Sequence, residues 1–146
     1  MSEMKRLRDG AIDLVELTRF PMSPSFGGVT YFIGMVRNLH DGKEVRAIRY
    51  HAHETLAERR LGEIEAEAAR LFGAEVHLAH AVGDLVVGDA SVLVVATAGH
   101  RAESFAACRW AIDTLKRTVP IWKEEQYVNG ESGFQQGIPL SSVRQE

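Results

Sequence analysis

Apolar residues recur with a helical period in two stretches of this chain, and this pattern restricts the fold more than any other feature. In residues 55–72 they lie three or four positions apart, and in residues 102–118 the same spacing continues until Pro120 ends it. Each stretch predicts a helix with one buried face. The first helix is expected to bury Ala57, Leu61, Ile64, Ala68 and Leu71, and the second Phe105, Cys108, Ile112, Leu115 and Val119.

The first of these helices carries signals at both ends. Thr55 and Glu58 have the spacing of a capping box, in which each side chain bonds a backbone N–H of the first turn. Gly73 follows the last periodic residue, and glycine readily adopts the left-handed conformation that ends many helices. These signals predict a helix that ends at Phe72.

Short runs of β-branched and aromatic residues predict strands between and around the helices. Asp41-Gly42 is typical of a hairpin turn, and Gly88-Asp89 of a second tight turn. The expected strands are residues 11–20, 29–36, 44–51, 76–82, 85–87 and 91–97. Two helices among five or six strands predict an α+β fold, with a mixed or antiparallel sheet and helices on one face.

Length and composition favour a single globular domain over residues 1–146. A chain of 146 residues with 45% hydrophobic residues is long and apolar enough to build one core. Residues 1–10 are densely charged, and we expect them to be disordered. Glycine, serine and glutamine are frequent after Asn129, so residues 126–146 are expected to form a loosely held tail.

Several features point to a cytoplasmic protein that does not bind membranes or nucleic acid. The charged N-terminus lacks the apolar core of a signal peptide, and the longest apolar runs fall far short of the ~20 residues of a membrane span. The single cysteine, Cys108, cannot form an intrachain disulfide, which suits a reducing compartment. The net charge of −3 gives no sign of a nucleic-acid partner.

Positive charge is concentrated in residues 100–123 of this acidic chain. That segment carries +3 without counting His100, which leaves −6 for the rest. Its charged residues are Arg101, Glu103, Arg109, Asp113, Lys116, Arg117 and Lys123. A local cationic cluster suggests a site for a small anion, whereas a solvated helix face with an Asp113–Arg117 ion pair is the simpler alternative.

His100 and Arg101 stand where a predicted strand passes into the second helix. The first turn of a helix presents free N–H groups and a partial positive charge, which attract anions. The guanidinium of Arg101 adds two-point recognition of a phosphate or carboxylate. The junction therefore predicts an anion site, and a plain capping or surface role is the alternative.

The histidines and the cysteine were weighed for metal binding and nucleophilic catalysis. His51 and His53 could share a strand face, and His77 and His80 form a second pair, but zinc sites usually need three or four ligands. Cys108 lies in the apolar stripe of its helix, where a buried thiol is usually inert. We predict neither a metal site nor a catalytic cysteine.

Four blocks of sequence, taken in order and spacing, resemble the large, catalytic subunit of molybdopterin synthase. The resemblance runs from about residue 28 to residue 125, and its most specific part is residues 115–125. The blocks are FIGMVRN at 32–38, VGDLVVGD at 82–89, HR at 100–101 and DTLKRTVPIWKEE at 113–125.

This resemblance implies a fold, a reaction and a partner. The implied fold is an α/β hammerhead. The implied reaction makes molybdopterin, in molybdenum cofactor biosynthesis, by adding the two dithiolene sulfurs to cyclic pyranopterin monophosphate. A small ubiquitin-like subunit would deliver the sulfur as a thiocarboxylate on its C-terminal Gly-Gly. A homodimer of the large subunit would bind one small subunit at each end, forming a heterotetramer.

The resemblance also implies the site residues. By position, Lys116 and Lys123 would be the catalytic pair. Residues that bind substrate would be Met35, Val36, Arg37, His100, Arg101, Lys116, Lys123, Glu124 and Glu125. Within that set, Arg37, His100 and Arg101 would hold the pterin phosphate.

The implied chemistry suits these residue types. A cyclic phosphate and a thiocarboxylate are both anions, so a site that they share should be cationic. A lysine that is crowded by other cations and partly desolvated has a lowered pKa, and it can act as an acid, a base or an oxyanion partner. No step requires a metal or another cofactor.

Two other function classes remain open at this point. The same fold and pocket could serve a non-catalytic module that binds anions or partner proteins. The histidines could instead make the chain a small metalloprotein. Both lysines together with His100-Arg101 favour the enzyme, because a binding module needs charge but not that full set.

Overall fold

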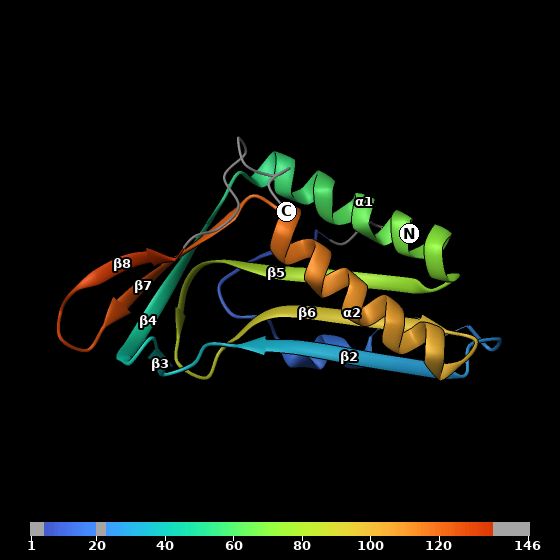
Figure 1. The fold of residues 1–146 in the computed structure, drawn as a ribbon, viewed down its shortest axis with the longest axis horizontal. Coiled ribbons are helices and arrows are strands. Elements are labelled where there is room, and N and C mark those ends of the chain that lie inside the picture. Colours follow the sequence, from blue (N-terminus) through green and yellow to red (C-terminus); the bar gives the residue numbers. More distant parts are fainter. Residues whose placement is uncertain (1–4, 20–22, 136–146) are drawn as a thin grey trace.

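A mixed sheet with two long helices on one face makes up most of the structure (Figure 1). The computed structural model describes residues 5–19 and 23–135. Its elements in chain order are β1 (Leu7–Asp9), η1 (Leu14–Thr18), β2 (Gly28–Met35), β3 (Leu39–His40), β4 (Lys43–Ala52), α1 (Glu54–Phe72), β5 (Glu75–Val86), β6 (Ala90–Ala98), α2 (Arg101–Thr118), β7 (Ile121–Tyr127) and β8 (Ser132–Gln135). The predicted α+β class with two main helices is confirmed.

The strands follow the order β2-β6-β5-β4-β7-β8, and each neighbouring pair is antiparallel. β1 pairs in parallel with β5, and β3 pairs with β4. β5 links two parts of the sheet, since its first half pairs with β6 and its second half with β4. Gly83 lies between these halves with a φ of 96°, in the left-handed region. After Gly83, the second half of β5 pairs with β4. Strands β4, β7 and β8 lie apart from β2 and β6 in Figure 1.

The strand predictions between residues 29 and 97 are confirmed, with one change. The runs 76–82 and 85–87 form one continuous strand, β5, because Gly83 lets the chain bend without leaving the sheet. The hairpin at Asp41-Gly42 is confirmed, and both residues have positive φ, as a two-residue hairpin turn requires. Gly88-Asp89 likewise joins β5 to β6.

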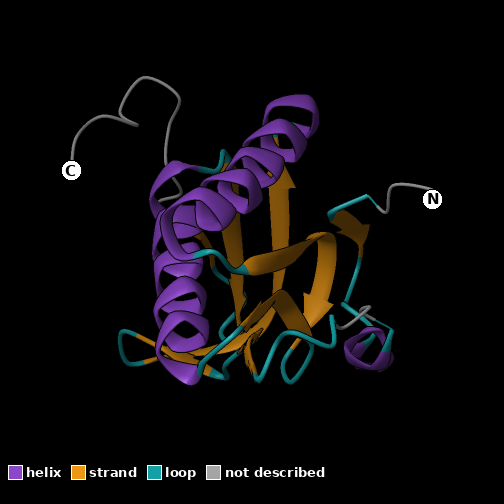
Figure 2. Ribbon diagram, turned by 90° about the vertical axis from the view of Figure 1, so that its right-hand side faces the viewer, coloured by secondary structure: helices purple, strands orange, loops and turns teal. Residues whose placement is uncertain are grey.

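The two long helices lie on the same side of the strands (Figure 2). α1 packs on β5, and α2 packs on β6 and β2. The predicted buried residues Ala57, Leu61, Ile64, Ala68, Cys108, Ile112, Leu115 and Val119 are confirmed.

Two residues of the predicted stripes are exposed instead. Leu71 is 50% exposed, because the neighbouring Phe72 packs inward and meets the ring of Trp110. Phe105 is 63% exposed. Its neighbour Ser104 takes the sheet-facing position and bonds Thr30 and the Ala96 carbonyl. Both predictions were wrong, because in each case the adjacent residue of the helix takes the inward-facing position.

The capping box predicted at Thr55 and Glu58 is also wrong. His53 is the N-cap of α1, and its Nδ1 accepts a hydrogen bond from the N–H of Leu56. The Glu58 carboxylate instead accepts hydrogen bonds from the backbone N–H groups of Arg6 and Leu7. The helix end at Gly73 is confirmed, with a φ of 62°.

The N-terminal segment is more ordered than its charge suggested. Leu7–Asp9 form strand β1 within the stretch expected to be disordered, and residues 1–4 lie outside the described part. The strand expected at 11–20 is instead the 3-10 helix η1, where the Asp13 side chain caps the N–H of Val15. Phe20 lies outside the described residues.

Part of the expected tail is also in the sheet. Gln126 and Tyr127 end β7, and Ser132–Gln135 form β8, which pairs with β7. Residues 136–146 lie outside the described part. Among the helices of the described ranges, none has the length and apolar character needed to cross a membrane.

Candidate active site

A small cavity of about 40 Å³ lies where the end of β2 meets β4 and β7. Its lining residues are Met35, Val36, Arg37, Leu39, Ile48, Tyr50, Lys123 and Glu125. Five of these residues were predicted from the sequence: Met35, Val36, Arg37, Lys123 and Glu125. The cavity is therefore the candidate site.

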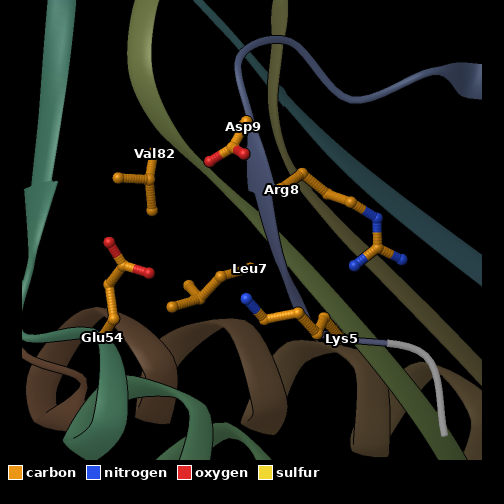
Figure 3. A pocket seen from close by; sticks show the side chains of 6 residues that line it. All are labelled: Lys5, Leu7, Arg8, Asp9, Glu54 and Val82. Carbon is orange, nitrogen blue, oxygen red and sulfur yellow. The ribbon is translucent and has the colours of Figure 1, made fainter.

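A larger hollow of about 340 Å³ lies beside β1 (Figure 3). Its walls carry both signs of charge, with Lys5 and Arg8 against Asp9 and Glu54. None of the residues predicted for the site lines it. The larger hollow is therefore not the candidate site.

Strand alternation decides which β7 residues face the cavity. Lys123 and Glu125 are two residues apart on one face, and their cross-strand partners on β4 are Tyr50 and Ile48. Glu124 points to the other face, where its Oε1 lies 3.0 Å from Nε2 of His51. The structure therefore brings Glu125 to the site and takes Glu124 away from it.

Glu125 is a buried carboxylate, and its side chain is only 4% exposed. Its Oε1 accepts a hydrogen bond of 2.9 Å from the Tyr127 hydroxyl. Its Oε2 lies 3.7 Å from Nζ of Lys123 and 3.9 Å from Nδ1 of His40. Lys123 thus has a fixed negative counter-ion.

Lys116 lies in the last turn of α2, and its charge interacts with that of Lys123. Burial of its ammonium group, and then the nearby charge of Lys123, lower the pKa of Lys116 below the ordinary lysine value. No carboxylate of the described residues makes an ion pair with it. The residue as a whole still has an exposed surface, so the ammonium is crowded without being sealed from solvent.

The chain turns sharply between the two lysines. α2 ends at Thr118, and the N–H of Ile121 bonds the carbonyl of Val119 across Pro120. β7 then runs back along β4. This turn brings Lys123 within electrostatic reach of Lys116, as expected from the proline.

Residues 35–37 reach the cavity at the end of the edge strand β2. The pairing with β6 is irregular between Gly34 and Met35, and Val36 is then held by bonds with the backbone of Gly88 and Asp89. Val36 is buried, whereas the side chains of Met35 and Arg37 are exposed. Arg37 therefore lines the cavity while its side chain remains exposed.

His100 and Arg101 lie at the other end of α2. His100 is the N-cap residue but makes no side-chain capping bond, and both side chains are exposed. Lys116 lies fifteen residues after Arg101 on α2, a rise of about 22 Å along the helix axis. Within one chain, the structure does not bring His100 and Arg101 to the cavity.

Tyr50, Ile48 and Leu39 line the cavity, and the sequence reasoning missed them. The sequence shows that residues of the predicted hairpin alternate between two faces, but it does not show what lies opposite them. The register that places Tyr50 opposite Lys123 joins residues 73 positions apart, and no local pattern reports that pairing.

Three of the histidines have structural partners, and the cysteine is buried. His53 caps α1, His51 meets Glu124, and Nδ1 of the buried His80 bonds the Ala81 carbonyl. Burial raises the pKa of the Cys108 thiol to about 11, so the reactive thiolate is scarce at neutral pH. In the described ranges, no three metal-ligating side chains come together.

Comparison with known proteins agrees with this geometry. A family model described as MoaE protein matches residues 7–118. The molybdopterin synthase catalytic subunit of Nostoc sp. is 42% identical over 123 residues, which cover 83% of this chain and 74% of that relative.

Solved structures of molybdopterin synthase share the fold. The Staphylococcus aureus structure matches with a TM-score of 0.82 at 28% identity, over 92% of this chain and 99% of that one. A Helicobacter pylori complex of subunits 1 and 2 of molybdopterin-converting factor matches with a TM-score of 0.74, over 96% and 97%. At 23% identity, that second match shows the fold alone. On these findings, the chain belongs to the MoaE protein family.

Proposed function

We infer that this chain is the catalytic subunit of molybdopterin synthase. It transfers sulfur from the C-terminal thiocarboxylate of a small ubiquitin-like subunit to cyclic pyranopterin monophosphate. The observation that carries this proposal is the cavity of a MoaE-family chain that Lys123 lines beside the carboxylate of Glu125, with Lys116 close enough for its charge to interact with that of Lys123.

The different surroundings of the two lysines suggest different roles. The ammonium group of Lys123 lies 3.7 Å from the Glu125 carboxylate, and this pairing holds it where it can meet an anionic substrate group. Lys116 has a lowered pKa, so it gives up a proton more readily than an ordinary lysine does. We assign to Lys116 the proton needed when the cyclic phosphate opens, or the charge that stabilises an oxyanion.

The second half of the reaction needs the same cationic setting. After sulfur has bonded to the pterin, an acyl link still joins it to the partner's C-terminus. Water adds to the carbonyl carbon, the carbon–sulfur bond breaks, and a carboxylate and a pterin thiolate remain. The tetrahedral oxyanion of this step would form beside Lys116 and Lys123.

His100 and Arg101 fit this reaction if a second copy supplies them. In the described part of the chain, β2 pairs with β6 on one side and with no strand on the other. Its edge also exposes apolar side chains at Val29, Tyr31, Phe32 and Met35. Unpaired, apolar edges of this kind readily pair with another chain.

Antiparallel pairing of two β2 strands would complete the site. β2 begins at Gly28, beside Arg101: a Cβ on Gly28 would lie 3.2 Å from the Cα of Arg101. β2 ends at Met35, on the cavity. A two-fold axis through the middle of the strand sets one copy's Gly28 opposite the other copy's Met35. Each cavity would then receive His100 and Arg101 from the other copy.

The proposal includes a small protein partner and a cytoplasmic location. The Helicobacter pylori structure is titled as a complex of two subunits, which supports a small partner for its relatives. The single cysteine is buried and forms no disulfide, which suits a reducing compartment.

Reconstitution tests the proposal directly. The purified chain is mixed with a thiocarboxylated small subunit and cyclic pyranopterin monophosphate, and dithiolene product is measured. We expect product formation that depends on all three components. Binding of the pterin and the small subunit without any product would identify a binding module instead of an enzyme.

A further inference from the structure

Tyr127 ends β7, and its hydroxyl group lies against the buried carboxylate beside the cavity. The residue is 6% exposed, and its hydroxyl donates a hydrogen bond of 2.9 Å to Oε1 of Glu125. Lys123, Glu125 and Tyr127 follow one another at intervals of two residues, so their side chains lie on the same face of the strand. The blocks that carry the family resemblance end at Glu125 and give Tyr127 no role.

The two carboxylate oxygens of Glu125 face different groups. Oε1 accepts the hydrogen bond from Tyr127, whereas Oε2 lies 3.7 Å from Nζ of Lys123 and 3.9 Å from Nδ1 of His40. Both contacts of Oε2 are longer than a hydrogen bond, so they do little to fix the direction of the carboxylate. The bond from Tyr127 therefore decides which oxygen is presented to Lys123.

The ring of Tyr127 is itself held in place. Nζ of Lys43 on β4 lies 5.0 Å from the ring centroid, within the range of a cation–π contact. The backbone N–H of Tyr127 bonds the carbonyl of Glu131, and its carbonyl accepts a bond from the N–H of Gly130. These bonds close the turn between β7 and β8. A ring fixed on both sides keeps its hydroxyl at one position.

β8, which runs beside β7, leaves room for this hydroxyl (Figure 1). The cross-strand partner of Glu125 on β8 is Gly133, which has no side chain. A Cβ at Gly133 would lie 3.5 Å from the hydroxyl oxygen of Tyr127. A side chain larger than alanine at this position would therefore crowd the hydroxyl group.

We propose that Tyr127 is a positioning residue for Lys123, acting through Glu125: its hydroxyl fixes the carboxylate so that Oε2 faces the ammonium group at the cavity. This inference rests on the proposed function for its catalytic meaning, since Lys123 is the residue assigned there to an anionic substrate group. Without the hydrogen bond, the carboxylate would rotate among the rotamers open to it. Lys123 would then lose a counter-ion of fixed position, and its ammonium group would occupy several positions.

The order of the Lys123 side chain can be measured on the protein alone. The sequence has four lysines, so ¹³C labelling of their Cε atoms gives a simple NMR spectrum, and Lys123→Arg assigns the signal of interest. The two Hε protons of an ordered lysine have different chemical shifts, and averaging over rotamers brings the shifts together. We expect two separate shifts in the wild-type protein, and we expect Tyr127→Phe to reduce their separation by about half or more.

Gln126 provides a matched control on the opposite face of β7. Its Oε1 accepts a hydrogen bond of 3.2 Å from Nη2 of Arg46 in an exposed setting. Gln126→Met removes that hydrogen bond from the position next to Tyr127. It should leave the Lys123 signals and the rate of product formation unchanged.

A double-mutant comparison separates positioning from a general effect on the fold. In the reconstituted reaction, Tyr127→Phe should lower product formation about fivefold, because a hydrogen bond to a buried carboxylate is lost. Glu125→Gln removes the charge that faces Lys123, so in that background Tyr127→Phe should cause a further loss of less than about twofold. A tyrosine that only stabilises the fold would cause the same loss in both backgrounds.

Merged Hε signals of Lys123 in the wild-type protein, or an unchanged separation in a folded Tyr127→Phe protein, would overturn the proposal. Equal losses of activity in the two backgrounds would overturn it as well. If Tyr127→Phe does not fold, Gly133→Val crowds the hydroxyl instead and should also reduce the separation. An unchanged separation in that folded variant would contradict the proposal. Absence of product in the wild-type reaction would count against the proposed function but would leave the NMR measurement as a valid test.

Discussion

The ammonium group of Lys123 lies 3.7 Å from the buried carboxylate of Glu125, two residues further along β7. The next carboxylate in the sequence, Glu124, faces the other side of the strand and meets His51. Strand alternation therefore selects one of two adjacent glutamates as the counter-ion. This pairing sets Lys123 apart from Lys116, which has no such partner among the described residues.

Glu125→Gln should cut product formation by about tenfold or more, because Lys123 loses its counter-ion in a buried setting. The amide oxygen can still accept the Tyr127 hydrogen bond, so the fold should persist by circular dichroism. Glu124→Gln is the matched control on the opposite face and should cause a much smaller loss. Equal losses in the two variants would contradict the assignment of Glu125.

Lys116→Ala should lower the rate of product formation by about 100-fold or more, as the loss of an acid–base or oxyanion group commonly does. Single-turnover measurement of dithiolene product checks this. Lys116→Arg should restore little activity if a proton is transferred, because arginine stays protonated. Folding and binding of the small subunit should survive in both variants. A normal rate in Lys116→Ala would remove this lysine from the mechanism.

Arg101→Ala and Lys116→Ala should complement each other if two chains share each site. Each variant alone should be nearly inactive. After random exchange of subunits, half of the dimers hold both variants, and one of their two sites is intact, so the mixture should regain about one quarter of wild-type activity. A mixture as inactive as its components would place all catalytic residues of a site in one chain.

Arg101→Ala should also weaken binding of the pterin far more than binding of the small subunit, because it removes a charge-assisted contact with phosphate. Calorimetric titration with each ligand separates the two effects. Unchanged pterin affinity, or a comparable loss for the small subunit, would rule out this role.

Glu58→Gln should destabilise the docking of β1 on α1, with a loss of about 2 kcal/mol at pH 7. Burial tends to raise the pKa of Glu58, but hydrogen bonds from Arg6 and Leu7 and the charge of Arg6 lower it overall. Because the carboxyl pKa is lower in the folded protein than in the unfolded chain, the carboxylate stabilises the fold at pH values above the unfolded-state pKa. This stabilisation is lost as the pH falls through the folded-state pKa. The difference in thermal stability between the two proteins should therefore shrink as the pH falls below the ordinary glutamate pKa of about 4.3. A difference that stays constant with pH would contradict the electrostatic explanation.

Local sequence patterns predicted most of the secondary structure. The helical periods, Pro120 and Gly73 fixed both long helices to within one residue or so, because periodicity and helix-stopping residues act over a few positions. The errors at Leu71 and Phe105 have one cause. Periodicity identifies a buried stripe, but contact with the sheet decides where its edges lie.

The sequence by itself determined the family, through ordered blocks that include Lys116 and Lys123, and it determined an α+β chain whose proline redirects α2 into β7. Only the tertiary structure decided that Glu125 and not Glu124 accompanies Lys123, that Tyr50 lies opposite Lys123, and that residues 35–37 line the same cavity as Lys123. These relationships depend on strand register and on which strands meet at the cavity. Both are set by contacts between residues far apart in the chain, which a local pattern cannot record.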